Sequence, residues 1–196
     1  MGADKAHLRF GDETMLDRVV RILAPEVSEL WLVAREGQPV PRVEVADGPV
    51  PVARDPAEGL GPLAAIVAGL RAIDSERAFV ISCDSPLLQP ALVSQLFDLA
   101  RDHRAVLPRV DGRLVPTTAV YARALLPAAE SLLARGELRP RRLVDEPGVR
   151  VVAEDDLRVS DPELLSFRDC DTPEDYRSLL VRAGLDPSLS RMLAAE

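Results

Sequence analysis

Short, largely apolar runs alternate with segments of helical periodicity along this chain, and this alternation constrains the fold more than any other feature. Residues 30–34 and 78–83 are runs of the length and character that strands buried on both faces have. Residues 14–23 and 63–73 instead place apolar side chains at helical spacing. Strands that alternate with crossover helices predict an α/β fold, in which helices cover both faces of a mostly parallel sheet.

The rest of the chain continues the same alternation. Thr172 followed by Pro173 is a helix-start signal, and Asp12 or Thr14 is expected to cap the first helix. Further helices are expected over residues 90–100, 122–134 and 173–182, and further extended segments over residues 50–53, 105–107, 118–121, 149–153 and 166–167.

Length and composition favour one globular domain over residues 1–196, because 47% of the residues are hydrophobic and no repeat or linker divides the chain. The net charge of −8 argues against a broad nucleic-acid-binding surface. No apolar run is long enough to span a membrane, and Met1 is not followed by a signal sequence. We therefore expect a cytoplasmic protein without nucleic-acid or membrane partners, with Cys83 and Cys170 as free thiols.

The basic residues are unusual, because 23 arginines accompany a single lysine, Lys5. A lysine that persists among so many arginines indicates a position that needs a compact ammonium, such as one that neutralises a polyphosphate. The alternative is a solvated lysine near the chain terminus.

Acidic side chains follow two of the predicted strands. Asp84 comes directly after residues 78–83, and Asp55 follows residues 50–53. Ligands of open α/β sheets bind beyond the carboxyl ends of the strands, and carboxylate oxygens suit Mg²⁺. The alternatives are a helix-capping turn residue for Asp84 and a solvated loop acid for Asp55.

Asp169 and Asp171, before the last predicted helix, could complete a metal site or could only cap that helix.

Residues 59–64, GLGPLA, could present backbone donors to an anion or a base, although Gly-Pro often simply starts a helix. A basic cluster could receive an acceptor phosphate or could be a solvated face; its members are Arg139, Arg141 and Arg142. Neither histidine forms a triad and Cys83 lacks a base partner, so covalent catalysis is not expected.

Five stretches, taken in order and at their spacing, resemble the successive blocks of the molybdenum-cofactor guanylyltransferase family over nearly the whole chain. They are MGADKAHLRFGDETMLDRV, RDPAEGLGPLAAIVAGL, FVISCDSP, LVPTTAVYARALLPA and FRDCDTPEDY. The resemblance implies a Rossmann-like nucleotidyltransferase fold of the GT-A-like kind. It also implies transfer of GMP from GTP to a molybdopterin-type cofactor, with release of pyrophosphate and with Mg²⁺ as cofactor.

The resemblance also implies roles for individual residues. Lys5 would contact the nucleotide phosphates and Asp84 would bind Mg²⁺ and the nucleotide, with Asp171 as a second metal ligand. Asp55 and the turn containing Gly61, Pro62 and Leu63 would help to hold the nucleotide. Proteins that deliver the finished cofactor are the transient partners that such a function implies.

The chain departs from the family pattern in three places. The family begins with a buried strand and an L-A-G-G-x-S-x-R-M-G loop, whereas this chain starts at the Met-Gly of that loop. The comparison implies that the first strand of the sheet is missing here. The strands that would lie beside it are then expected to have unpaired edges. One hypothesis is a longer true product, which an in-frame stop codon directly upstream would contradict. Apolar Val33 stands where the family has an asparagine near the nucleotide, and Asp169 and Asp171 stand where it has asparagines.

Two other functions stay open at this point. The first is a cytidylyltransferase or another nucleotidyltransferase that acts on a different phosphorylated acceptor, because related cytidylyltransferases share the lysine and the strand-end aspartate. The second is a catalytically impaired relative that binds nucleotides and serves a regulatory role.

Overall fold

The computed structural model describes residues 5–55 and 61–188. Its strands are β1 (Arg9–Phe10), β2 (Glu13–Thr14), β3 (Leu32–Arg35), β4 (Glu44–Val45), β5 (Gly48–Pro49), β6 (Val52–Asp55), β7 (Arg77–Ile81), β8 (Ala105–Val110), β9 (Arg113–Leu114), β10 (Thr118–Ala122) and β11 (Val149–Val152). Its α-helices are α1 (Met15–Leu23), α2 (Gly61–Ala72), α3 (Pro90–Leu99), α4 (Leu126–Ala134), α5 (Glu154–Leu157) and α6 (Pro173–Arg182). Short 3₁₀ helices are η1 (Lys5–His7), η2 (Arg123–Leu125), η3 (Pro140–Asp145) and η4 (Leu165–Phe167).

The central sheet has the strand order β11-β8-β10-β7, with β9 paired to β8. Strands β7, β8 and β11 run in one direction, and β10 runs antiparallel to both of its neighbours. The α/β class is therefore confirmed, and within the path β11-β8-β10-β7 it is β10 that runs against the other strands. The physical reason is the short connection from β8 to β10 through β9, since a parallel return needs a crossover of a dozen or more residues.

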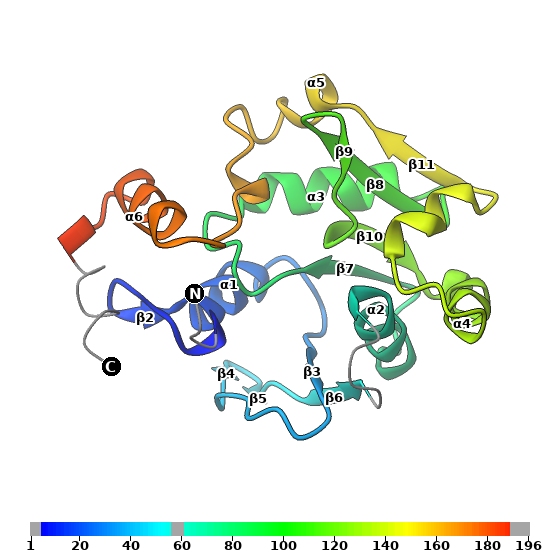
Figure 1. Cartoon of the computed structure of the whole chain (residues 1–196), viewed down its shortest axis with the longest axis horizontal. Helices are drawn as coiled ribbons and strands as arrows, with labels where there is room; N and C mark the ends of the chain where they lie inside the picture. Colours follow the sequence, from blue (N-terminus) through cyan, green and yellow to red (C-terminus); the bar gives the residue numbers. More distant parts are fainter. Residues whose placement is uncertain (1–4, 56–60, 189–196) are drawn as a thin grey trace.

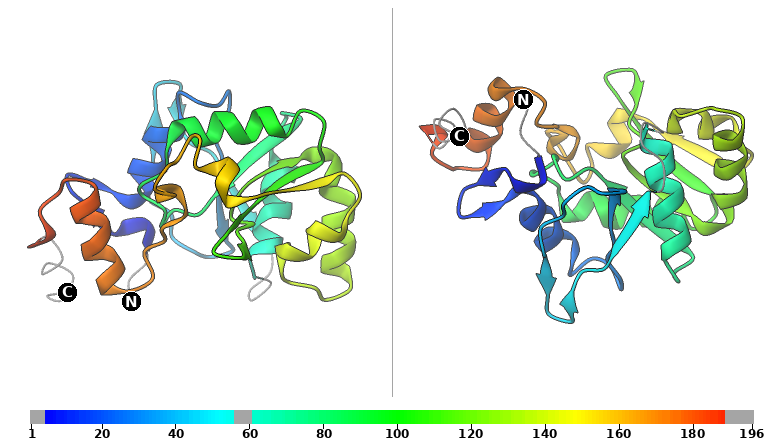
Figure 2. Two further views of the ribbon diagram at one scale, coloured as in Figure 1. Left: turned by 90° about the horizontal axis from the view of Figure 1, so that it is seen from above. Right: turned by 60° about the horizontal axis from the view of Figure 1, so that its bottom comes forward.

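Helices cover both faces of this sheet (Figures 1 and 2). Val106, Val120 and Val152 point to the face that α3 covers, where they pack with Leu92 and Leu96. The alternate positions of β8 and β10 point to the opposite face, where they pack against α2 and α4; these positions are Ala105, Leu107, Ala119 and Tyr121. Because successive side chains along a strand point to opposite faces of the sheet, the core is divided into two layers.

Strand β3 pairs in parallel with β6, in a two-stranded unit below the central sheet in Figure 1. Within the described residues neither β3 nor β7 has a second strand partner. An open cavity of about 800 Å³ has residues of both strands in its wall, together with apolar side chains of α1 and α2.

Local signals place the helix starts. Thr14 is the N-cap of α1 and accepts a hydrogen bond from the backbone of Asp17, whose carboxylate accepts in return from the Thr14 backbone. Thr172 and Asp175 form the same capping box at α6. No helix in the described ranges has both the length and the apolar character needed to cross a membrane.

Two predicted extended segments need correction. Strand β7 ends at Ile81 rather than at residue 83, so Asp84 lies in the loop beyond the strand and not at its last position. Residues 166–167 belong to the 3₁₀ helix η4 rather than to a strand. The buried Asp161 carboxylate causes this, because its two oxygens accept from the backbone N–H groups of Leu165 and Ser166 at 2.9 and 2.8 Å.

Candidate functional site

The segment that carries Lys5 is held by its own hydrophobic side chains. Helix η1 leads into the β1–β2 hairpin, and Phe10 and Met15 are buried in a cluster that includes Tyr176 and Leu179 of α6. The rings of Phe10 and Tyr176 meet edge to face with their centroids 6.2 Å apart. Residues 8–15 are therefore packed against α6, and Lys5 projects from the segment directly before them.

Asp84 lies in the loop between β7 and α3, and two hydrogen bonds tie this loop to the segment before α6. The backbone carbonyl of Asp84 accepts from the backbone N–H of Cys170 at 3.0 Å. The Ser85 hydroxyl donates to the Asp169 carboxylate at 2.7 Å. These contacts bring together two acidic segments that are far apart in the sequence. Ser85 was not singled out from the sequence, and its place in the FVISCDSP block is the signal that could have found it.

Three of the predicted site residues meet in one group. The Lys5 ammonium donates to Asp84 Oδ2 at 2.5 Å and to Asp171 Oδ1 at 2.7 Å. The Lys5 side chain is 30% exposed, that of Asp84 only 10%, and that of Asp171 72%. Burial lowers the pKa of Lys5, but the hydrogen bonds with Asp171 and Asp84 outweigh it, so the net pKa is raised. Lys5 is therefore protonated at neutral pH.

The chemistry of this group fits a hard divalent cation bound together with a phosphate. Asp84 Oδ1 is buried and has no hydrogen-bond partner in the described residues, which leaves a carboxylate oxygen for an electropositive ligand. No group of three or more histidine, cysteine, aspartate or glutamate side chains forms a metal cage within residues 5–55 and 61–188. Mg²⁺ does not need such a cage, because proteins hold it with one or two carboxylates plus substrate phosphates.

Asp169 and Cys170 complete the surroundings of this group. Burial raises the pKa of the Asp169 carboxyl, and the nearby charges of Asp84 and Asp171 act in the same direction. Burial also raises the pKa of the Cys170 thiol, to about 12. A buried thiol of this kind is a poor nucleophile.

The residues predicted to hold the nucleotide lie around α2. Asp55 is 4% exposed at the end of β6 and lines a second cavity of about 330 Å³. Gly61 and Pro62 are exposed at the start of α2, and Gly61 adopts a φ of +64°. The Leu63 side chain is fully buried in the core, so it can offer a ligand only its backbone. Residues 59–60 of the same turn lie outside the described residues.

The basic cluster lies at η3 and is partly neutralised by Glu137. The Glu137 carboxylate pairs with Arg139 and Arg142, and the hydrogen bond from Arg139 is the main reason why the Glu137 pKa falls to about 2. Arg141 is exposed and has no ion pair to any residue in the described ranges. The cluster therefore offers a phosphate less positive charge than its three arginines suggest.

The fold and this group are typical of α/β proteins that bind phosphorylated ligands beyond the carboxyl ends of their strands. The sequence model of the family described as the MobA-like NTP transferase domain matches residues 1–153. The chain belongs to this family, and the resemblance drawn from the sequence is confirmed.

Curated relatives match most of the chain. One from Methanosarcina mazei, named probable molybdenum cofactor guanylyltransferase, is 32% identical over 189 residues, which are 92% of this chain and 84% of the relative. One of the same name from Mycobacterium bovis is 38% identical over 166 residues, covering 79% of this chain and 78% of the relative.

Solved structures show the same fold. Molybdopterin-guanine dinucleotide biosynthesis protein A from Archaeoglobus fulgidus superposes with a TM-score of 0.74 at 20% identity, over 93% of this chain and 92% of that one. A 2-C-methyl-D-erythritol 4-phosphate cytidylyltransferase from Thermus thermophilus superposes with a TM-score of 0.68 at 19% identity, over 92% of this chain and 94% of that one. At these identities the structural likeness supports the nucleotidyltransferase fold and not a particular substrate.

Proposed function

We propose that this chain is a magnesium-dependent molybdenum cofactor guanylyltransferase, which transfers GMP from GTP to a molybdopterin-type cofactor and releases pyrophosphate. The observation that carries the proposal is the Lys5 ammonium held between Asp84 and Asp171, in a family whose curated relatives bear the name of this activity. The group combines a fixed positive charge with carboxylate oxygens, which is what binding a metal-bound triphosphate requires.

In this reaction a terminal phosphate oxygen of the cofactor attacks the α-phosphorus of GTP. A new phosphoanhydride bond forms, the bond between the α-phosphorus and the bridging oxygen breaks, and pyrophosphate leaves with that oxygen and its electron pair. No covalent enzyme intermediate is needed, so the chain's task is to align the reacting groups and to neutralise phosphate charge.

The three polar side chains divide this task. Lys5 has three N–H donors, of which the two carboxylates take two and leave one for a phosphate oxygen. Asp84 Oδ1 and the exposed carboxylate of Asp171 would hold Mg²⁺. When bound, Mg²⁺ supplies charge neutralisation on the phosphates. The raised pKa of Lys5 keeps its charge in place throughout the neutral pH range.

The substrates' other contacts follow from the remaining predicted residues. Asp55 and the turn containing Gly61, Pro62 and Leu63 would hold the nucleotide, with the backbone N–H groups of Gly61 and Leu63 as donors in the first turn of α2, since Pro62 has none. The basic residues at η3 would receive the acceptor phosphate, with Arg141 contributing the most because no acidic side chain in residues 5–55 and 61–188 pairs with it. Delivery proteins would take up the finished cofactor after the transfer.

The test is to incubate the 196-residue protein with Mg²⁺, molybdenum cofactor and one nucleotide at a time, and to measure the dinucleotide and pyrophosphate formed. We expect product with GTP, and no product when EDTA removes the metal. Product with CTP but none with GTP would contradict guanylyl transfer and would identify cytidylyl transfer as the reaction. Nucleotide binding in calorimetry without product from any nucleotide would contradict an enzymatic function and would favour a regulatory one.

A further inference from the structure

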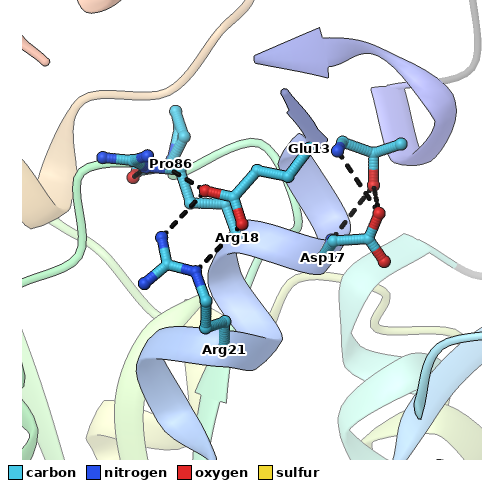
Figure 3. Close-up of polar contacts among 6 residues, drawn as sticks. Glu13, Asp17, Arg18, Arg21 and Pro86 are labelled. Carbon is cyan, nitrogen blue, oxygen red and sulfur yellow. Dashed lines mark hydrogen bonds and ion pairs between the residues drawn. The ribbon is translucent and has the colours of Figure 1, made fainter. Parts of the chain in front are cut away.

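The side chain of Arg18 connects α1 to the β1–β2 hairpin and to the loop that carries Asp84. It projects from α1, and its Nε donates to the backbone carbonyl of Pro86 at 2.8 Å. Its Nη1 donates to Glu13 Oε1 at 3.1 Å, at the end of the β1–β2 hairpin (Figure 3). Its guanidinium carbon lies 5.1 Å from the centroid of the Phe10 ring. Only 21% of this side chain is exposed, so its charged hydrogen bonds are partly shielded from water.

The position of the Arg18 contact matters because the loop that carries Asp84 lies beyond the end of β7. Asp84 is three residues past Ile81, so no strand pairing holds it in place. On the α6 side the loop is tied by Cys170 and Asp169, as described above. On the α1 side the hydrogen bond from Arg18 to Pro86 holds the backbone two residues after Asp84.

Lys5 and Arg18 lie on one continuous segment, and Asp84 and Pro86 lie on another. The two segments meet at both ends of this stretch, through the contact of Lys5 with Asp84 and the contact of Arg18 with Pro86. Loss of the second contact removes the hold on the α1 side of the loop, so that the loop can shift about its contacts on the α6 side while the Lys5 segment stays packed against α6. A shift of about 1 Å at a reacting group is enough to lower activity about a hundred-fold.

We infer that Arg18 is a positioning residue for the proposed reaction: it clamps the Asp84 loop to the segment that carries Lys5, and so sets the distance between the ammonium and the metal-binding carboxylate. This inference rests on the proposed function for its catalytic meaning. The clamp itself is a property of the contacts among Arg18, Glu13 and Pro86.

Arg21 provides a matched control on the same helix. It carries the same charge, and it donates to both oxygens of the same partner, Glu13, at 3.0 and 2.8 Å. Its side chain is 61% exposed, and in Figure 3 its dashed lines run to the Glu13 carboxylate and not to Pro86. The hydrogen bond from Arg21 is the main reason why the pKa of Glu13 is lowered. Replacement of Arg21 thus removes a Glu13 ion pair without touching the Asp84 loop.

The test compares Arg18→Met with Arg21→Met, because methionine keeps an apolar stem and removes the donors. Lys5 is the single lysine of the chain, so lysine-selective isotope labelling gives one NMR signal that reports on the site without turnover. Mg²⁺ alone is titrated into each protein while this signal is followed. The GTP reaction is then measured as a function of Mg²⁺, with kcat and KM separated and the melting temperature recorded.

We expect Arg18→Met to change the Lys5 signal and to raise the Mg²⁺ concentration needed for half of its response and half of the activity by about ten-fold to a hundred-fold. Arg21→Met should match the wild type in both. The inference is overturned if the two variants behave alike, or if Arg18→Met lowers only the melting temperature. If the wild type forms no product, the proposed function fails, but the Mg²⁺ response of the Lys5 signal still decides the role of Arg18.

Discussion

Lys5 and Asp84 are separated by 79 positions in the chain, yet the ammonium nitrogen of the first lies 2.5 Å from a carboxylate oxygen of the second. Asp171, a further 87 positions along the chain (171 − 84), contacts the same ammonium at 2.7 Å. Both contacts depend on how the hairpin, the β7–α3 loop and the segment before α6 pack together. The following predictions probe this group and its support.

Replacement of Lys5 by alanine should lower kcat/KM for GTP by about a hundred-fold or more, since the lost ammonium is the fixed positive charge at the phosphates. Arg9→Ala is the matched control, because Arg9 is exposed on β1 four positions further on. It should change kcat/KM little. Steady-state kinetics on both variants decide the matter, and equal effects would show that the Lys5 ammonium does not neutralise the nucleotide phosphates.

Asp84→Asn should lower activity by about a hundred-fold, because a neutral amide is a weak ligand for Mg²⁺. A bound metal ion that neutralises phosphate charge stabilises the transition state by several kcal/mol. The amide oxygen can still accept from Lys5, so the melting temperature should change little. Asp171→Asn, at the 72% exposed carboxylate, should have a smaller effect. Full activity of a folded Asp84→Asn protein would remove Asp84 from the metal site.

Asp169→Asn should stabilise the fold at neutral pH. The raised pKa of Asp169 means that the folded state binds the carboxyl proton more tightly than the unfolded state does. The free energy of unfolding therefore falls as the pH rises from the unfolded-state pKa of 3.8 to the higher folded-state pKa. The amide keeps an acceptor for Ser85 and removes the buried charge. The gain should therefore be present above that pH range and absent below pH 3.8, as measured by urea unfolding at several pH values. A gain that is independent of pH would contradict this account.

Thr172→Ala should lower the free energy of unfolding by about 1 kcal/mol, because it removes the side-chain acceptor of the α6 capping box. Thr14→Ala at α1 removes the same kind of capping box and should have a similar effect on stability. Asp171 directly precedes the cap of α6, so Thr172→Ala is expected also to change the Lys5 NMR signal. Urea unfolding and that signal test both points, and a silent Lys5 signal would show that the α6 cap does not position Asp171.

Much of the secondary structure could be predicted from local signals. The capping boxes at Thr14 and Thr172, the apolar run that became β7, and the helical spacing that became α2 all act within a few residues. The two-residue strands of the β1–β2 and β4–β5 hairpins escaped notice because so few residues carry no periodicity. The site's acidic and basic candidates were also recognisable, since residue type and position after a strand are local properties.

Residue type and short-range spacing were therefore sufficient for the α/β class and the main helices, and the order of the five family-like stretches led to the choice of Lys5, Asp84 and Asp171. Packing alone decided that these three side chains touch, that β10 runs against its neighbours, and that Arg18 reaches the carbonyl of Pro86. The physical reason is that contacts between distant segments depend on the burial of whole faces, such as Phe10 and Met15 against α6, and no short window of sequence contains both partners.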